Sequence, residues 1–180
     1  ELKLEGQFYN HPSYLESVAN MVRKFDLDIY DHILFSYHGL PLRQIQKVHP
    51  AVIPDDCTCE TSFPLHGNLC YKATCFETTR LLAEKLNLNL ENYSTSFQSR
   101  FARSWLGPFT DSALKNLASS GKKRVLVVAP SFTADCLETI LEVAEEYAGL
   151  FKSAGGSQLD LVPALNDEDD WVEAIVEIAG

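Results

Sequence analysis

Four short runs rich in β-branched and aromatic residues alternate along this chain with segments of helical character, and this alternation is the feature that most restricts its fold. The runs cover residues 32–37, 93–99, 124–132 and 158–165. Strands separated by helices favour a parallel sheet, because each crossover then packs a helix against one of the two faces. We therefore predict an α/β fold, a three-layer, doubly wound, four-stranded parallel sheet.

The segments between the runs carry apolar residues at helical spacing. They predict helices over 12–25, 76–88, 110–120, 135–154 and 167–179. Thr110 is expected to cap the third of these helices, with Gly121 just past its end, and Gly155 and Gly156 are expected to close the fourth. Only the stretch from 41 to 74 reads as weakly structured, and a loop of that length inside a compact domain calls for a functional explanation.

Composition and charge exclude several classes of protein. A chain of 180 residues suits one domain, and its net charge of −10 argues against a nucleic-acid binder. No apolar run reaches the roughly 18 residues that a membrane-spanning helix needs. Five cysteines without a signal peptide favour a reducing, cytoplasmic location and a metal site over disulfides. Because the chain starts without Met, we expect a fragment whose N-terminal partner region is absent.

Ligands of such sheets bind beyond the carboxyl ends of the strands, where His38 and Glu138 fall. His38 directly follows the first strand, and its imidazole could move protons or bind a metal. The alternative is a histidine that only satisfies a loop carbonyl. Glu138 begins the helix after the third strand, and Glu142 and Glu146 follow at four-residue spacing. For these two glutamates, the alternative is an ordinary solvated helix surface.

Aromatic and basic residues follow the second and third strands. Arg100, Arg103 and Trp105 lie in one loop, and Phe132 lies in the next. They could form an aromatic plate and cationic anchors for a flat ligand with carboxylates. Core packing with surface charge explains them equally well.

Cys57, Cys59, Cys70 and Cys75 follow the pattern C-x-C-x10-C-x4-C. Four clustered thiols are soft ligands that favour zinc or an iron–sulfur cluster. Zinc ribbons mostly use C-x2-C, so this spacing favours a [2Fe-2S] cluster, with zinc as the alternative. The fifth cysteine, Cys136, could be a buried apolar residue or a thiol that faces the site.

Four separate motifs occur together in an order that resembles the C-terminal half of the ferrochelatase family. They are "ILFSYHGLP", "SFQSRFARSWLGPFTD", "VLVVAPSFTADCLETILEVAEEY" and "LVPALND". The resemblance implies a chelatase-like, Rossmann-type domain, one of two similar α/β domains with the porphyrin between them. Residues 1–180 would be the C-terminal half, inactive alone, with 41–75 as a cysteine-rich insertion.

The implied activity is that of a lyase of heme and porphyrin biosynthesis, which inserts Fe(II) into protoporphyrin IX to make protoheme. A related branch of the family uses coproporphyrin III instead. An alternative of another class is a non-catalytic module that binds an iron–sulfur cluster and a partner protein.

The resemblance also assigns roles residue by residue. His38 matches the active-site histidine, which binds metal or removes pyrrole protons, and Glu138 matches the glutamate that faces it across the macrocycle. Glu142 and Glu146 fall on a proposed path for metal or protons, and Trp105 matches a tryptophan of the porphyrin pocket. With Trp105, the remaining candidates for substrate binding are Tyr37, Arg100 and Phe132. Many relatives have Glu in place of Leu42 and His in place of Cys136.

Some bacterial members of the family are similar to this chain in having cysteines inserted after the active-site histidine. The resemblance therefore implies that Cys57, Cys59, Cys70 and Cys75 hold a [2Fe-2S] cluster with a structural or regulatory role. The implied partners are the porphyrin, the absent N-terminal domain and, at most, a membrane surface contacted peripherally. Whether the chain forms a homodimer is left open.

Overall fold

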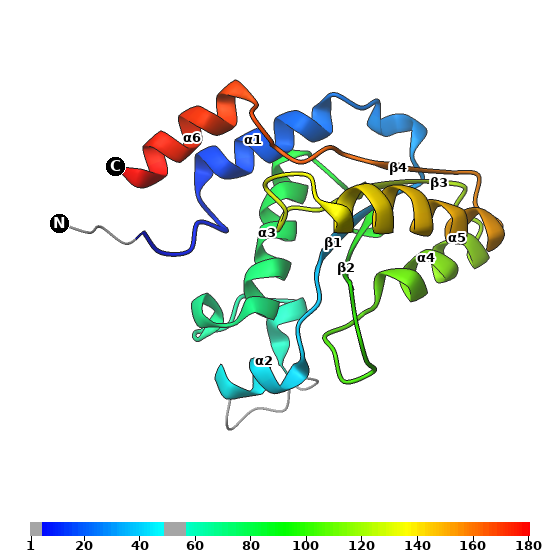
Figure 1. The fold of residues 1–180 in the computed structure, drawn as a ribbon, viewed down its shortest axis with the longest axis horizontal. Helices are drawn as coiled ribbons and strands as arrows, with labels where there is room; N and C mark the ends of the chain where they lie inside the picture. Colours follow the sequence, from blue (N-terminus) through cyan, green and yellow to red (C-terminus); the bar gives the residue numbers. More distant parts are fainter. Residues whose placement is uncertain (1–4, 49–56) are drawn as a thin grey trace.

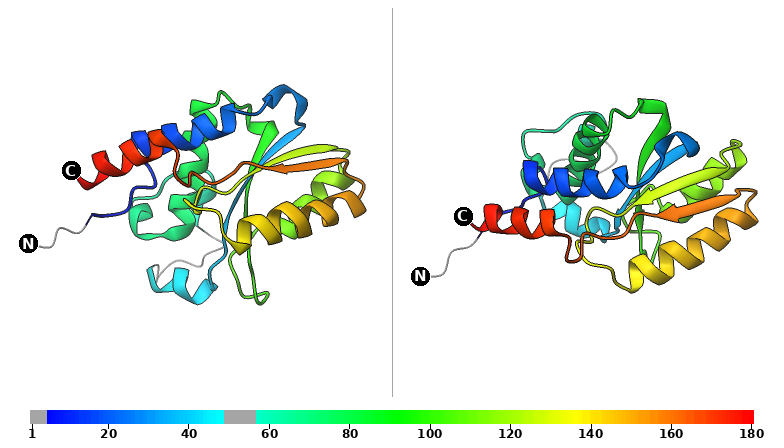
Figure 2. Two further views of the ribbon diagram at one scale, coloured as in Figure 1. Left: turned by 45° about the horizontal axis from the view of Figure 1, so that its top comes forward. Right: turned by 90° about the horizontal axis from the view of Figure 1, so that it is seen from above.

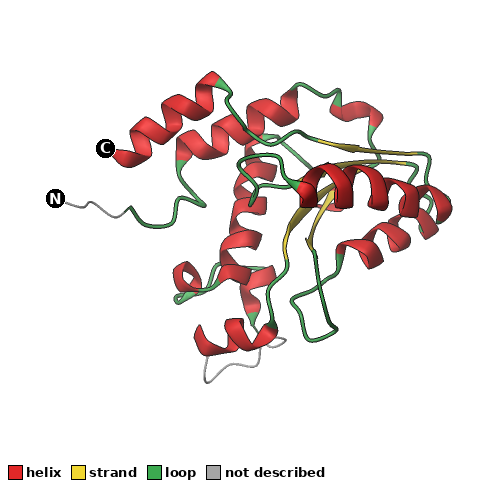
Figure 3. Cartoon of the chain, viewed as in Figure 1, coloured by secondary structure: helices red, strands yellow, loops and turns green. Residues whose placement is uncertain are grey.

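The computed structural model of the protein describes residues 5–48 and 57–180. At its centre lies a sheet of four parallel strands in the order β2-β1-β3-β4 (Figure 1; Figure 3). The strands are β1 (His32–His38), β2 (Tyr93–Gln98), β3 (Arg124–Val128) and β4 (Gln158–Leu161). The predicted four-stranded parallel sheet is thus confirmed.

Helices cover both faces of the sheet, which makes three layers (Figure 2). One face packs against α1 (Pro12–Arg23), α3 (Tyr71–Lys85) and α6 (Asp169–Ala179). The other face packs against α4 (Thr110–Ser119), the π-helix η6 (Glu138–Tyr147) and α5 (Ala148–Ser153). The doubly wound arrangement is therefore confirmed as well.

Side chains of β1 alternate between the two faces of the sheet, and each face has its own hydrophobic core. Ile33, Phe35 and Tyr37 belong to the core under α1 and α3, whereas Leu34 belongs to the core under α4 and α5. Ser36 also points to the second face, where its hydroxyl contacts Thr110 of α4 at 2.9 Å. Successive side chains of a strand point to opposite faces, so His38 shares the face of Ser36.

The chain leaves β1 for β2 on one side and then returns to β3 on the other. The carboxyl ends of β1 and β3 therefore border the topological switch point, where ligands of such sheets bind. His38 ends β1, and the loop from Ala129 to Leu137 follows β3 and leads to Glu138. The fold alone thus brings the two candidate residues to one edge.

The prediction that the stretch from 41 to 74 lacks regular structure was wrong. Within its described part, the stretch contains α2 (Leu42–Val48), the 3-10 turns η3 (Thr58–Glu60) and η4 (Gly67–Leu69), and the start of α3. The first turn of α3 begins at Tyr71 rather than at Phe76, so Cys75 lies inside a helix. These elements are short and lack a clear apolar period, so the pattern did not reveal them. Part of the stretch, 49–56, lies outside the described residues.

Two helix boundaries also differ from the sequence prediction. Thr110 is the first residue of α4 and not its N-cap, which is Phe109. Its hydroxyl is buried between Ser36 and Ser96, which hold it at 2.9 Å each. The expected single long helix is a π-helix, η6, continued by α5. Stretches of π-helix occur frequently at functional sites.

The remaining 3-10 turns are η1 (Leu27–Ile29) and η5 (Leu90–Asn92). Gly121 and Gly155 have φ angles of 92° and 104° and follow α4 and α5, as predicted for helix ends. None of the helices within 5–48 and 57–180 combines the length and apolar character that crossing a bilayer requires.

His32 makes the stability of this fold dependent on pH. Its side chain is 5% exposed at the start of β1, with Nε2 2.8 Å from Ser94 Oγ. Burial lowers the pKa of His32 to about 4, and the charge of Lys122 adds to this effect. The unfolded chain binds this proton near pH 6.5, whereas the folded chain does not. The folded state therefore has its full stability, as far as His32 is concerned, above pH 6.5. That stability is lost progressively as the pH falls from 6.5 towards 4, because the unfolded chain then gains a proton that the folded chain does not.

We expect the free energy of unfolding to fall by up to about 1.4 kcal/mol per pH unit from this group alone. Urea unfolding of the wild type and of His32→Gln, compared between pH 5 and 6.5, measures the effect. The variant should have a smaller slope, and equal slopes in both proteins would contradict the prediction.

Candidate functional site

His38 is half-buried at the end of β1, and its backbone N–H, its carbonyl and its Nδ1 atom each make a hydrogen bond. Its backbone N–H donates to Ser131 Oγ at 3.3 Å, and its carbonyl accepts from the Tyr71 hydroxyl at 2.9 Å. Its Nδ1 lies 2.6 Å from the carbonyl oxygen of Gly39. A carbonyl oxygen can only accept, so Nδ1 carries the hydrogen, and in the neutral ring Nε2 keeps its lone pair. Nε2 is thus the atom that can bind a metal or take a proton.

Glu138 reaches the same edge from the first turn of η6. Its pKa is lowered by a hydrogen bond from the Cys136 thiol, then by a backbone N–H and by the charge of His38. Gln98 Nε2 donates to the Glu138 carbonyl at 3.2 Å and so ties η6 to the end of β2. The lowered pKa favours the ionised form of Glu138, and the influence of His38 on it indicates that the two side chains share this edge of the sheet.

Two aromatic rings flank the imidazole. The ring centroids of Trp105 and Phe132 lie 6.4 and 6.1 Å from that of His38. Phe101 packs edge-on against Trp105 at 5.3 Å, although it is 88% exposed. The loop with Trp105 is bound to the segment after His38, because the N–H of Leu106 donates to the carbonyl of Leu40 at 2.8 Å. The result is an apolar rim around a polar pair.

Gly39 lets the ends of β1 and β2 approach this closely. Its N–H donates to the carbonyl of Gln98 at 2.8 Å, and a Cβ added at Gly39 would lie 2.8 Å from that oxygen and 3.4 Å from the Trp105 ring. We expect Gly39→Ala to cost about 1–3 kcal/mol of unfolding free energy, because the backbone has to move. Denaturant unfolding measures this cost.

Gly149→Ala is the matched control, since nothing lies within 4 Å of a Cβ added there in α5. It should be neutral or stabilising by up to about 1 kcal/mol, as alanine favours a helix over glycine. Equal stability of the two variants would contradict the crowding at Gly39.

Two of the other charged candidates, Glu142 and Arg100, are paired within the fold. Glu142 accepts hydrogen bonds from the Ser99 N–H at 2.9 Å, from Ser99 Oγ at 2.5 Å and from the Tyr147 hydroxyl at 2.6 Å. Arg100 lies 2.7 Å from Asp111 and 4.1 Å above the Phe109 ring. Glu146 and Arg103, in contrast, are exposed.

Tyr37 lies away from the edge where His38 is found. Its side chain is 2% exposed, on the opposite face of β1, and its hydroxyl is 2.9 Å from Thr79 Oγ1 of α3. It lines a cavity of about 260 Å³ together with Tyr71, Cys75 and Ser131. A role of Tyr37 in substrate binding would therefore act through the packing beneath the site.

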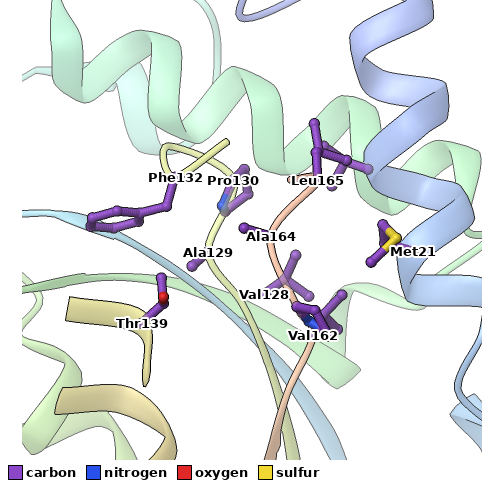
Figure 4. Close-up of a pocket in the computed structure, with 11 residues that line it drawn as sticks. Met21, Val128, Ala129, Pro130, Phe132, Thr139, Val162, Ala164 and Leu165 are labelled. Atoms are coloured by element: carbon purple, nitrogen blue, oxygen red, sulfur yellow. The ribbon is translucent and has the colours of Figure 1, made fainter. Parts of the chain in front are cut away.

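A second pocket lies at the carboxyl ends of β3 and β4 (Figure 4). Phe132 and Thr139 line one side, and Met21 of α1 and Leu165 line the other. Its volume of about 20 Å³ suits one water molecule and not a macrocycle. This pocket therefore cannot hold a macrocycle, and the candidate surface for a large flat ligand remains the rim around His38.

The four clustered cysteines form no disulfide in the structure, and they lie close enough to influence one another. Burial raises the pKa of Cys59 to about 12, and a hydrogen bond with Cys57 adds to this. Burial also raises the pKa of Cys75, and the charges of Cys70 and Cys59 add to it. Lys72 lies among them as a buried cation, 2.6 Å from Glu60.

The donor set of these four thiols fits a soft metal in its chemistry. Over the described ranges, however, no three His, Cys, Asp or Glu side chains form a group arranged to hold a metal ion. Metal binding would therefore require the thiols to turn towards a common point. A bound cation would also favour their thiolate form, against the effect of burial.

Comparison with known proteins identifies the family. A family model described as Ferrochelatase matches residues 1–180. The chain belongs to the ferrochelatase family. It is 41% identical to the Ferrochelatase of Ectopseudomonas mendocina (strain ymp) over 93% of this chain, which is 50% of that relative. It is 38% identical to the Ferrochelatase of Pseudomonas fluorescens (strain Pf0-1) over 99% of this chain and 53% of the relative.

The ferrochelatase of Pseudomonas putida strain KT2440 is 36% identical over 99% of this chain and 54% of its own length. The chain thus spans about half the length of the curated ferrochelatases it matches. The predicted resemblance to the ferrochelatase family is confirmed.

Several residues that hold this candidate site were missed by sequence reasoning. They are Tyr71, Gln98, Ser99 and Ser131. Gln98 and Ser131 lie at or just beyond strand ends, which is the same signal that singled out His38. Tyr71 carried no such signal, because it lies in α3, a helix whose first turn was read as loop.

Proposed function

We propose that this chain is the C-terminal half of a ferrochelatase and that the whole protein inserts Fe(II) into protoporphyrin IX to make protoheme. The observation that carries the proposal is that His38 and Glu138 lie at the switch point of the sheet, in a chain of this family. The aromatic rim of Trp105 and Phe132 supports a flat, apolar substrate at that place.

In this proposal, two pyrrole N–H protons must leave as the iron enters. The Nε2 atom of His38 is free to accept a proton, because Nδ1 already donates to Gly39. The carboxylate of Glu138 offsets the positive charge that then develops on His38 and can hold the incoming cation weakly. Weak ligands suit a transfer reaction, because ligands that bound iron tightly would keep it.

The remaining site residues have supporting roles in the proposal. Trp105 and Phe132 contact the macrocycle, and Tyr37 supports the floor beneath it. Arg100 binds a propionate only by exchanging its Asp111 partner. Glu142 and Glu146 form the route by which iron arrives, although the hydrogen bonds of Glu142 restrict its motion.

The second wall of the substrate cleft belongs, in this proposal, to the N-terminal domain of the same enzyme. We propose a cytoplasmic protein with at most a peripheral contact with membranes. The experiment is to join this chain to the N-terminal half of a close relative and to measure iron insertion into protoporphyrin IX and coproporphyrin III. This chain alone should be inactive with both, and the joined protein active.

A higher kcat/KM for coproporphyrin III would assign the chain to that branch. Absence of turnover with both porphyrins, in a joined protein that folds, would reject the enzyme proposal and favour a non-catalytic module.

We further propose that Cys57, Cys59, Cys70 and Cys75 hold a [2Fe-2S] cluster with a structural or regulatory role. The burial of Cys59, Cys70 and Cys75 and the hydrogen bond between Cys57 and Cys59 support this, and zinc is the alternative metal. Iron, acid-labile sulfide and zinc should be counted per chain after anaerobic purification. About two irons and two sulfides, lost in Cys70→Ser, are expected, and one zinc without sulfide would reject the cluster.

A further inference from the structure

Tyr71 connects the cysteine-bearing helix α3 to the candidate catalytic histidine. We propose that Tyr71 is a positioning residue for His38. Through Tyr71, binding of a metal by the four clustered thiols changes the position of the His38 imidazole. This inference deepens the proposed function and rests on it only for the role of His38. The contacts themselves are independent of any activity.

The first step is the hydrogen bond from the Tyr71 hydroxyl to the His38 carbonyl, at 2.9 Å. It joins two segments 33 residues apart in the sequence, the first turn of α3 and the end of β1. On the other side of the same residue, the N–H of His38 donates to Ser131 Oγ at 3.3 Å. The backbone of His38 is therefore held between α3 and the loop after β3.

The second step is the position of Tyr71 among the thiols. It directly follows Cys70 and lies one helical turn before Cys75, which are 1% and 3% exposed. Tyr71 and Cys75 line the same cavity of about 260 Å³, together with Ser131.

The third step is mechanical. In this proposal, gathering the four thiols on a metal shifts the first turn of α3, because Cys70 and Cys75 are packed in the core and the described thiols do not form a metal-holding group where they lie. The cavity beside the Tyr71 ring gives the ring space to move. A shift of the Tyr71 hydroxyl changes its hydrogen bond to the His38 carbonyl. The imidazole then moves with the backbone, because Nδ1 is hydrogen-bonded to the adjacent Gly39 carbonyl.

The test uses the NMR signals of histidine labelled with ¹⁵N and ¹³C in the reduced chain. His38 is assigned from the signals lost in His38→Gln. One equivalent of Cd(II), a soft metal, is then added as the probe of the thiols. Binding of Cd(II) directly to His38 is identified in Cys70→Ser, where the set of four thiols is broken.

We expect Cd(II) to shift the His38 carbonyl and ring signals in the wild type. In Tyr71→Phe, which keeps the ring and loses the hydroxyl, the shift should fall to less than half. Tyr30→Phe is the matched control, since it loses a hydroxyl 2.6 Å from Asp160, on β4 and away from this edge. It should keep the full shift.

Equal shifts in Tyr71→Phe and the wild type would overturn the proposal, as would Cd(II) binding that leaves His38 unshifted. Ser131→Ala provides a second variant if Tyr71→Phe folds poorly, because it releases the other side of the His38 backbone. Ser131→Ala should change the size of the Cd(II)-induced shift of the His38 signals. An unaltered shift would count against the proposed connection between the thiols and His38. The NMR test and the test of the proposed function can fail separately. If the joined protein were inactive but Tyr71→Phe still reduced the Cd(II)-induced shift of His38, only the proposed activity would be rejected.

Discussion

Replacement of His38 by alanine is expected to lower kcat/KM for iron insertion by about 10²–10⁴-fold in the joined two-half protein. The variant lacks Nε2, the atom left free to accept a pyrrole proton by the bond between Nδ1 and Gly39. The measurement is the initial rate of metalloporphyrin formation against porphyrin concentration, at fixed Fe(II).

The fold should survive this change, because the imidazole is only half-buried and the backbone bonds to Tyr71 and Ser131 stay in place. We expect the free energy of unfolding to change by less than about 1 kcal/mol. His11→Ala is the matched control, since the His11 side chain makes no capping bond to α1. If His38→Ala kept activity within about threefold of the control, the assigned role would be wrong.

Glu142→Ala is expected to lower the free energy of unfolding by about 3 kcal/mol, because two donors of Ser99 and the hydroxyl of Tyr147 would lose a charged acceptor in a partly buried place. Ser99 has a φ of 59°, an uncommon conformation for a residue with a side chain, which the bonds to Glu142 stabilise. Urea unfolding with a linear extrapolation measures the loss.

Glu146→Ala, on the same helix and exposed, is the control and should change stability by no more than about 0.5 kcal/mol. Glu142→Gln separates structure from iron transport, because it keeps one acceptor oxygen and removes the charge. A raised KM for Fe(II) in Glu142→Gln and Glu146→Ala would support the iron route. Equal stability of Glu142→Ala and Glu146→Ala would show that the bonds of Glu142 do not hold the loop after β2.

Much of this fold could be predicted from the sequence, because β1 and β3 are mostly apolar runs, β2 and β4 are short segments between turn signals, and the helices between the strands are periodic. The stretch from 41 to 74 could not, since α2, η3 and η4 are too short to show a period. The cysteines there suggested a loop built around a metal. In the structure, Cys59, Cys70 and Cys75 are instead part of the main hydrophobic core.

The sequence by itself determined that His38 and Glu138 lie at one edge of the sheet, because each lies near the carboxyl end of a strand and parallel strands place those ends together. Only the tertiary structure decided which neighbours take part. Tyr37, adjacent to His38, turns to the opposite face, whereas Tyr71, which is distant in sequence, donates to the His38 carbonyl. Glu142 and Arg100 are likewise paired with Ser99 and Asp111. Local periodicity sets where a strand ends, but hydrogen-bond partners depend on how distant segments pack.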